Sequence, residues 1–130
     1  MKLKIMDLYV DDQEKALQFY TEKLGFQKKT DVGAGSYRWL TVASPEEPNG
    51  PELHLAPNAS PVAKAYQRGL HDQDTPAAMF FVSDIDAEYN RLSKLGVNFT
   101  MPVTKTTGSR IAKLDDTCGN LIQLTQLEWG

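Results

Sequence analysis

The sequence has little cysteine, little histidine and no long hydrophobic run. Its single cysteine, Cys118, has no partner for a disulfide within the chain, which fits a reducing compartment. No apolar stretch approaches the roughly 18 residues that cross a bilayer, and the start of the chain lacks the apolar region and cleavage site of a secretory signal. These absences predict a soluble, cytoplasmic protein without a membrane partner.

Positive charge is also scarce. The 130 residues contain 14 Lys and Arg against 17 Asp and Glu, a formal net charge of −3. Because a nucleic-acid phosphate backbone requires a dense basic surface, this balance argues against nucleic acid as a partner. The length and the 41% content of hydrophobic residues suit one small domain with a single core.

The chain contains an internal repeat. Three short motifs of the first half return in the same order in the second half, at offsets of 72, 71 and 69 residues, an arrangement that chance rarely produces. The matched segments are residues 9–12 with 81–84, residues 23–26 with 94–97, and residues 50–55 with 119–124. The sequence therefore predicts two copies of one structural module.

Each copy begins with an apolar strand that leads into an amphipathic helix. The strand ends in aspartate, Asp11 and Asp12 in the first copy and Asp84 in the second, and an aspartate there can cap the helix by accepting from its first amide groups. Gly25 and Gly96 follow the helices where the backbone turns left-handed, a conformation that glycine adopts without strain.

The remaining patterns complete a βαβββ order in each copy. The fold class predicted is α+β, with two βαβββ modules forming a curved mixed sheet around a cleft and the helices outside. Strands are expected over residues 3–10, 26–30, 37–43, 52–56, 77–82, 97–101, 109–114 and 121–127. One domain spans residues 1–130, with module one at about 1–57, a linker at 58–76 and module two at about 77–130. The linker is expected to hold one or two helical turns, and residues 102–108 a surface loop.

These features together resemble the vicinal oxygen chelate superfamily, which includes glyoxalase I, bleomycin-resistance proteins, fosfomycin-resistance enzymes and extradiol dioxygenases. The resemblance is carried by the paired modules, the step at residues 10–12, the helix end at 19–26 and the segment 115–124. It implies a cleft formed by two modules, either within one chain or across a swapped dimer. A homodimer is expected, since the modules leave apolar sheet surface and edges that a second copy can cover.

Metal-using members of that superfamily place their ligands on the first and last strands of each module. The matching positions here are Ile5, His54, Ala77 and Gln123. Ile and Ala carry no donor atom, and a catalytic metal usually has about three protein ligands. No cofactor is therefore expected, with a weak divalent metal at His54 and Gln123 as the alternative.

Alternation of side chains along the strands predicts which residues line the cleft. A mixture of polar groups and apolar walls is the composition of a small-molecule site. The candidate ligand-binding residues from alternation are Asp7, Tyr9, Glu52, His54, Met79, Phe81 and Gln123. Trp39 is added as a stacking plane and Arg38 and Arg110 as positive charges, with ordinary packing or a solvated strand face as the alternative for these three.

The function predicted from these residues is glyoxalase/bleomycin-resistance-like binding of a small organic molecule, without the divalent metal of the family. The alternative is a lyase or isomerase of glyoxalase type, with a degenerate metal site on His54 and Gln123. A third hypothesis is a module that serves only interaction or dimerisation. If catalysis occurs, His54 is the candidate general base.

Overall fold

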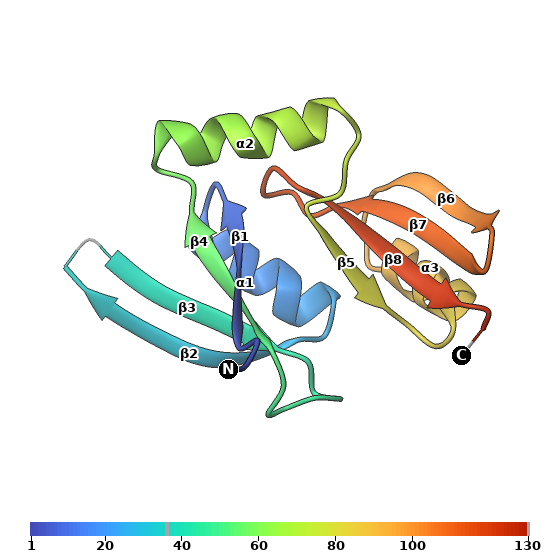
Figure 1. Ribbon diagram of the computed structural model, residues 1–130, viewed down its shortest axis with the longest axis horizontal. Helices are drawn as coiled ribbons and strands as arrows, with labels where there is room; N and C mark the ends of the chain where they lie inside the picture. The colour runs from blue at the N-terminus through green and yellow to red at the C-terminus, as the bar shows by residue number, and fades with distance from the viewer. Residues whose placement is uncertain (36, 130) are drawn as a thin grey trace. The chain divides into compact units, whose positions relative to one another are not determined.

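The computed structural model describes residues 1–35 and 37–129. The chain separates into two compact units, Met1–Ala65 and Tyr66–Gly130, so that the division falls within α2 (Pro61–Asp72) (Figure 1). Each unit holds one four-stranded mixed sheet.

The first unit has the predicted βαβββ order. Its strands lie in the order β1-β4-β3-β2, with β1 parallel to β4 and the other neighbours antiparallel. The elements are β1 (Ile5–Val10), α1 (Gln13–Gln18), the π-helical turn η1 (Phe19–Lys23), β2 (Gln27–Ala34), β3 (Tyr37–Ala43) and β4 (Glu52–Pro57).

The second unit repeats this topology. Its strands lie in the order β5-β8-β7-β6, again with one parallel pair, β5 with β8. The elements are β5 (Ala78–Phe81), α3 (Ile85–Lys94), β6 (Phe99–Thr106), β7 (Ser109–Asp115) and β8 (Leu121–Leu127). The α+β class and the two modules predicted from the repeat are confirmed.

The helix ends follow the sequence signals. The Asp12 carboxylate accepts from the backbone N–H of Lys15 at 3.0 Å, and that of Asp84 accepts from Ala87 at 3.1 Å. Gly25 and Gly96, the residues after the helices, both have a φ of +86°. The predicted N-caps and left-handed glycines are confirmed.

Three segments differ from the sequence prediction. Helix α2 runs over Pro61–Asp72, longer than the one or two turns expected in the linker. Strand β2 extends to Ala34, and β6 takes up most of the segment 102–108 that was expected to be a loop. The β-branched Val103, Thr104 and Thr106 favour the strand, and the register shift between Met101 and Thr104 accommodates Pro102, which has no N–H to donate.

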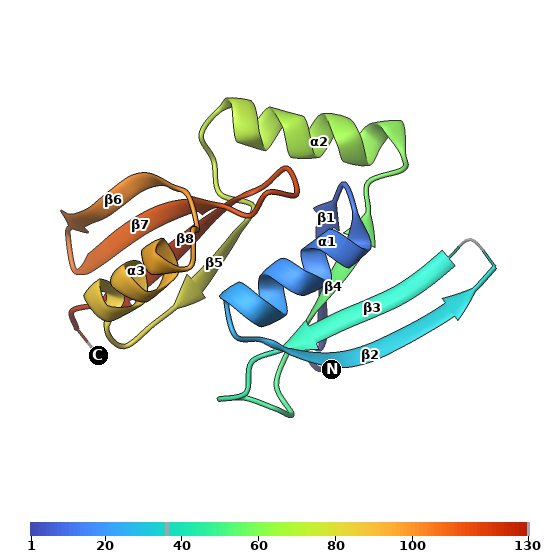
Figure 2. The same ribbon diagram turned by 180° about the vertical axis from the view of Figure 1, so that it is seen from behind.

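In each unit one helix covers one face of the sheet. Figure 2 shows α1 in front of β1 and β4 in the first unit, and α3 in front of β8 in the second. Apolar side chains from these layers are buried: Leu8, Val10, Ala16, Tyr20, Leu40, Val42 and Leu55 in the first unit, and Ile85, Leu92, Ala112, Leu114, Ile122 and Leu124 in the second. Within the described residues, no helix is long and apolar enough to cross a membrane.

Candidate functional site

A polar cluster lies on the face of the first sheet that is turned away from α1. The strand register sets His54 beside Asp7 on one side and Thr41 on the other. Trp39 and Glu52 lie two residues before Thr41 and His54 on the same strands, so alternation brings all five side chains to one face. We call these five residues the His54 face.

His54 is held on two sides. Its Nδ1 lies 2.8 Å from Oδ1 of Asp7, and its ring stacks on the Trp39 indole, with ring centroids 3.9 Å apart and an interplanar angle of 26°. The residue is only 6% exposed. Its Nε2 is buried and has no hydrogen-bond partner among the described residues. A buried polar atom left in this state costs about 1–3 kcal/mol, so the arrangement requires an explanation.

The second acid of the His54 face is satisfied within the unit. Glu52 is 8% exposed, accepts from the Thr41 hydroxyl at 2.8 Å and pairs with Lys4, whose Nζ lies 3.1 Å away. The hydrogen bond from Thr41 and the charge of Lys4 outweigh burial and lower the pKa of Glu52. Glu52 is therefore a fixed anion that supports the face.

Four of the candidate ligand-binding residues of the first unit share this face: Asp7, Trp39, Glu52 and His54. Tyr9, the fifth, lies two residues after Asp7 on β1 and is partly exposed on the same side. Thr41 was missed by the sequence prediction, although strand alternation with Trp39 places it there.

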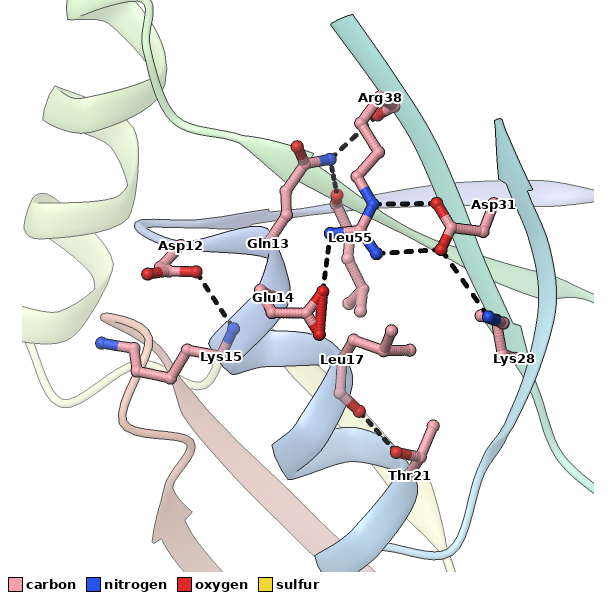
Figure 3. A network of polar contacts seen from close by, with 10 residues as sticks. All are labelled: Asp12, Gln13, Glu14, Lys15, Leu17, Thr21, Lys28, Asp31, Arg38 and Leu55. Carbon is pink, nitrogen blue, oxygen red and sulfur yellow. Dashed lines mark hydrogen bonds and ion pairs between the residues drawn. The ribbon is translucent and has the colours of Figure 1, made fainter. Parts of the chain in front are cut away.

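Arg38 lies on the opposite face, a correction to the expectation that it borders the same surface as Trp39. Its Nε and Nη2 donate to the two carboxylate oxygens of Asp31 at 2.8 and 2.9 Å, and its Nη1 donates to Glu14 of α1 at 3.1 Å (Figure 3). The hydrogen bond with Arg38 lowers the pKa of Asp31 and raises that of the guanidinium. The guanidinium links β2 and β3 to the helix.

The second unit has an equivalent face centred on Gln123. The register pairs Gln123 with Met79 on one side and Lys113 on the other, and pairs Thr125 with Phe81. The Gln123 amide donates to Thr125 Oγ1 at 3.1 Å and contacts Met79 Sδ at 3.8 Å. The predicted residues Met79, Phe81 and Gln123 thus lie on one face of the sheet.

The cation on that face is Lys113, whereas Arg110 belongs to the helix side. Lys113 Nζ donates to the backbone oxygen and the carboxylate of Asp74 at 2.8 and 2.9 Å, and its side chain is 14% exposed. Arg110 binds Asp86 of α3 at 2.7 and 3.0 Å, which corrects the expectation that Arg110 reaches the ligand surface. This contact repeats that of Arg38 with Glu14, 72 residues earlier in the chain.

The donor set does not fit the divalent metal that the superfamily implies. Of the four matching positions, Ile5 and Ala77 have no donor atom, which leaves the His54 imidazole and the neutral Gln123 amide. Over residues 1–35 and 37–129 the structure shows no group of three or more His, Cys, Asp or Glu side chains that could hold a metal ion. One imidazole nitrogen and one amide oxygen are fewer than the about three protein ligands that a catalytic metal usually has.

Comparison with known proteins gives a consistent picture. A family model described as the Glyoxalase/Bleomycin resistance protein/Dioxygenase superfamily matches residues 2–124. The uncharacterized protein YurT of Bacillus subtilis strain 168 is 52% identical over 126 residues, which cover 97% of this chain and 99% of YurT. The crystal structure of UcmS2 superposes with a TM-score of 0.83 at 30% identity, covering 96% of this chain and 97% of UcmS2. That of TnmS3, an antibiotic binding protein from Streptomyces sp. CB03234, has a TM-score of 0.79 at 28% identity, covering 98% of this chain and 97% of TnmS3.

Proposed function

Since the chain belongs to the Glyoxalase/Bleomycin resistance protein/Dioxygenase superfamily, we propose that it binds a small organic molecule on the His54 face, without the divalent metal of the family. The observation that carries this proposal is the Trp39–His54 stack beside a buried imidazole nitrogen that has no partner within the described chain. An aromatic plane next to a few fixed polar groups is the usual composition of a small-molecule site.

The proposed ligand class is that of antibiotics or compounds that resemble them. TnmS3, which is described as an antibiotic binding protein, matches almost the whole chain at 28% identity. The His54 face offers such a compound the partly exposed Trp39 indole for stacking and His54 for a polar contact.

Tryptophan fluorescence tests the proposal. The chain has two tryptophans, so a Trp129→Phe variant leaves Trp39 as the single reporter on the His54 face. Titration of this variant with a panel of antibiotics that includes bleomycin is expected to give saturable quenching with at least one compound, unchanged by EDTA. If none of the compounds gives saturable quenching, and calorimetry on the unaltered protein detects no binding, the proposal fails.

A matched pair of variants then locates the site. Trp39→Ala is expected to weaken the binding of the compound found in that panel by at least about ten-fold, since an aromatic side chain covered by its ligand commonly contributes that much. Trp129→Phe is expected to keep the affinity within about two-fold. An equal loss in both variants would assign the binding to another surface.

We further propose that the protein is a homodimer. Strands β1 and β5 lie at the edges of their sheets, and two apolar side chains on β5, Met79 and Phe81, are 55% and 60% exposed. A second copy of the chain can cover such edges and side chains. Light scattering on the eluting protein is expected to give twice the chain mass, and Phe81→Arg is expected to shift it toward the monomer; a monomeric mass for the unaltered protein would reject the dimer.

The enzymatic alternative is supported by the unpartnered Nε2 of His54, because such a nitrogen can take a metal or a proton. This alternative assigns the chain a glyoxalase-type lyase or isomerase activity with a degenerate metal site on His54 and Gln123. It requires metal-dependent turnover of a hemithioacetal that His54→Ala abolishes. Turnover that is equal in the unaltered protein and in His54→Ala, or absent from both, rules out the enzymatic alternative.

A further inference from the structure

The donors and acceptors of the His54 face are unequally matched. Nε2 of His54 is buried without a partner in the described part of the chain. The hydroxyl of Thr41, the residue paired with His54 on β3, donates its single proton to Glu52, and the Lys4 ammonium is paired with the same carboxylate. The Thr41 hydroxyl is therefore engaged with Glu52 and not with Nε2.

Asp7 determines which nitrogen of His54 carries the proton. A carboxylate only accepts, so the contact of 2.8 Å between its Oδ1 and Nδ1 places the ring proton on Nδ1. In the neutral ring, Nε2 is then an acceptor with its lone pair in the ring plane.

Trp39 cannot supply the missing donor from its position. Its ring is stacked on the imidazole at an interplanar angle of 26°, so its indole N–H points along the imidazole plane and not toward the Nε2 lone pair. Trp39 is partly exposed, whereas His54 is buried.

We infer that the ligand of this face presents an O–H or N–H donor, next to a planar apolar body, to Nε2 of His54, which Asp7 holds as an acceptor. This inference rests on the proposed function and deepens it. A site of this kind selects phenols, alcohols and primary or secondary amides over ethers, esters and tertiary amides of the same shape. It also gives the orphaned nitrogen a role that needs no metal, in agreement with the missing donors at Ile5 and Ala77.

The first test leaves the His54 side chain unmutated. In protein labelled with ¹⁵N-histidine, two-bond ¹H–¹⁵N correlation spectra distinguish His54 from His71, the other histidine, once His71→Asn assigns them. His54 is expected to show a protonated Nδ1 and an unprotonated Nε2, and Asp7→Ala is expected to give a mixture of tautomers. A protonated Nε2 in the unaltered protein overturns the inference.

The second test compares two probes of nearly equal shape, phenol and anisole. Phenol is expected to bind at least about ten-fold more tightly than anisole and to shift the His54 Nε2 resonance, because a site built to pair with a hydroxyl rejects the analogue without it. His54→Phe keeps a ring against Trp39 and is expected to reduce this preference to within about two-fold.

The outcomes separate the two proposals. Equal binding of phenol and anisole to the unaltered protein overturns the inference and leaves the proposed function standing. If neither probe nor any compound of the antibiotic panel perturbs Trp39 or His54, the proposed function fails and the inference falls with it. A stoichiometric shift of Nε2 by Zn²⁺ or Ni²⁺, absent from His54→Phe, assigns the nitrogen to a metal and also overturns the inference.

Discussion

The Arg38 guanidinium holds the Asp31 carboxylate through two hydrogen bonds, 2.8 Å from Nε to Oδ1 and 2.9 Å from Nη2 to Oδ2. This pair lies on the α1 side of the first sheet, because the same guanidinium also reaches Glu14. Trp39, the next residue on β3, stacks on His54 on the other side. Two adjacent residues therefore have different surroundings, which makes them a matched pair for mutation.

Arg38→Met is expected to leave ligand affinity within about two-fold and to lower Tm by no more than about 4 °C, because exposed ion pairs contribute little to stability. Trp39→Ala is expected to lower the affinity for the same ligand by at least about ten-fold. Calorimetry with the tightest compound of the antibiotic panel, together with thermal unfolding, checks both. A ten-fold loss in Arg38→Met with Tm unchanged would return Arg38 to the ligand surface.

Thr41→Val tests the buried carboxylate of the His54 face. The change removes the hydroxyl that donates to Glu52 at 2.8 Å and leaves an isosteric methyl group. Loss of a buried hydrogen bond to a charged group is expected to cost about 1.5–3 kcal/mol in urea unfolding at pH 7. Thr41→Ser, which keeps the donor, is expected to lose less. Equal losses in the two variants would show that packing and not the hydrogen bond is responsible.

The difference in stability between the unaltered protein and Thr41→Val is expected to depend on pH. The pKa of Glu52 is lower in the folded chain than its ordinary value, mainly because of Thr41. A lowered folded pKa gives stability that is complete above the unfolded pKa and is lost as the pH falls through the folded pKa. The stability difference between the unaltered protein and Thr41→Val is expected to be largest above about pH 5 and to shrink toward about pH 3. A difference that stays constant over this range contradicts the assignment.

The helix ends could be predicted because their causes are local. The caps at Asp12 and Asp84 and the left-handed Gly25 and Gly96 depend on residues a few positions apart, all visible in one sequence. The lengths of β2 and β6 depend instead on pairing with a partner strand, and the register shift that accommodates Pro102 is a property of that pair.

The candidate site also has features that the sequence predicts and features that depend on how the strands pair. Alternation along single strands correctly brought Asp7 and His54 to one side, whereas their direct pairing across parallel strands required the register. Arg38 and Arg110 were named for their positive charge and not from alternation, and both lie on the helix side. Alternation with Trp39 places Arg38 there, and alternation with Lys113 does the same for Arg110. The unpartnered state of His54 Nε2 depends on how the side chains of several strands pack around it, which no spacing encodes.

Metal titration addresses the missing donors. Calorimetry with Zn²⁺, Ni²⁺ and Mn²⁺ is expected to show no stoichiometric site of sub-micromolar affinity, because Ile5 and Ala77 have no donor atom and one imidazole nitrogen with one amide oxygen is too few. EDTA is expected to leave Tm unchanged. A sub-micromolar site that disappears in His54→Ala would contradict this prediction and favour the enzymatic alternative.

Gly119 is a sterically crowded position in the second unit. It has a φ of +100°, and a Cβ built there would lie 2.7 Å from Nε2 of Gln67. That amide is buried and cannot easily move away, since it donates to the backbone oxygen of Cys118 at 2.9 Å and to Oδ1 of Asn120 at 3.1 Å. Gly25 offers a control, because it has a φ of +86° and nothing within 4 Å of the same built atom.

Gly25→Ala is expected to cost about 1–2 kcal/mol, the usual penalty for an alanine in the left-handed region. Gly119→Ala is expected to cost at least about 1 kcal/mol more, because it also displaces Gln67 and breaks its two bonds. In a Gln67→Ala background the extra cost is expected to vanish, leaving the Gly119→Ala penalty within about 0.5 kcal/mol of that at Gly25. Urea unfolding of the single and double variants measures these terms. An unchanged Gly119→Ala penalty in that background would mean that backbone strain alone, and not the Gln67 contact, requires glycine at this position.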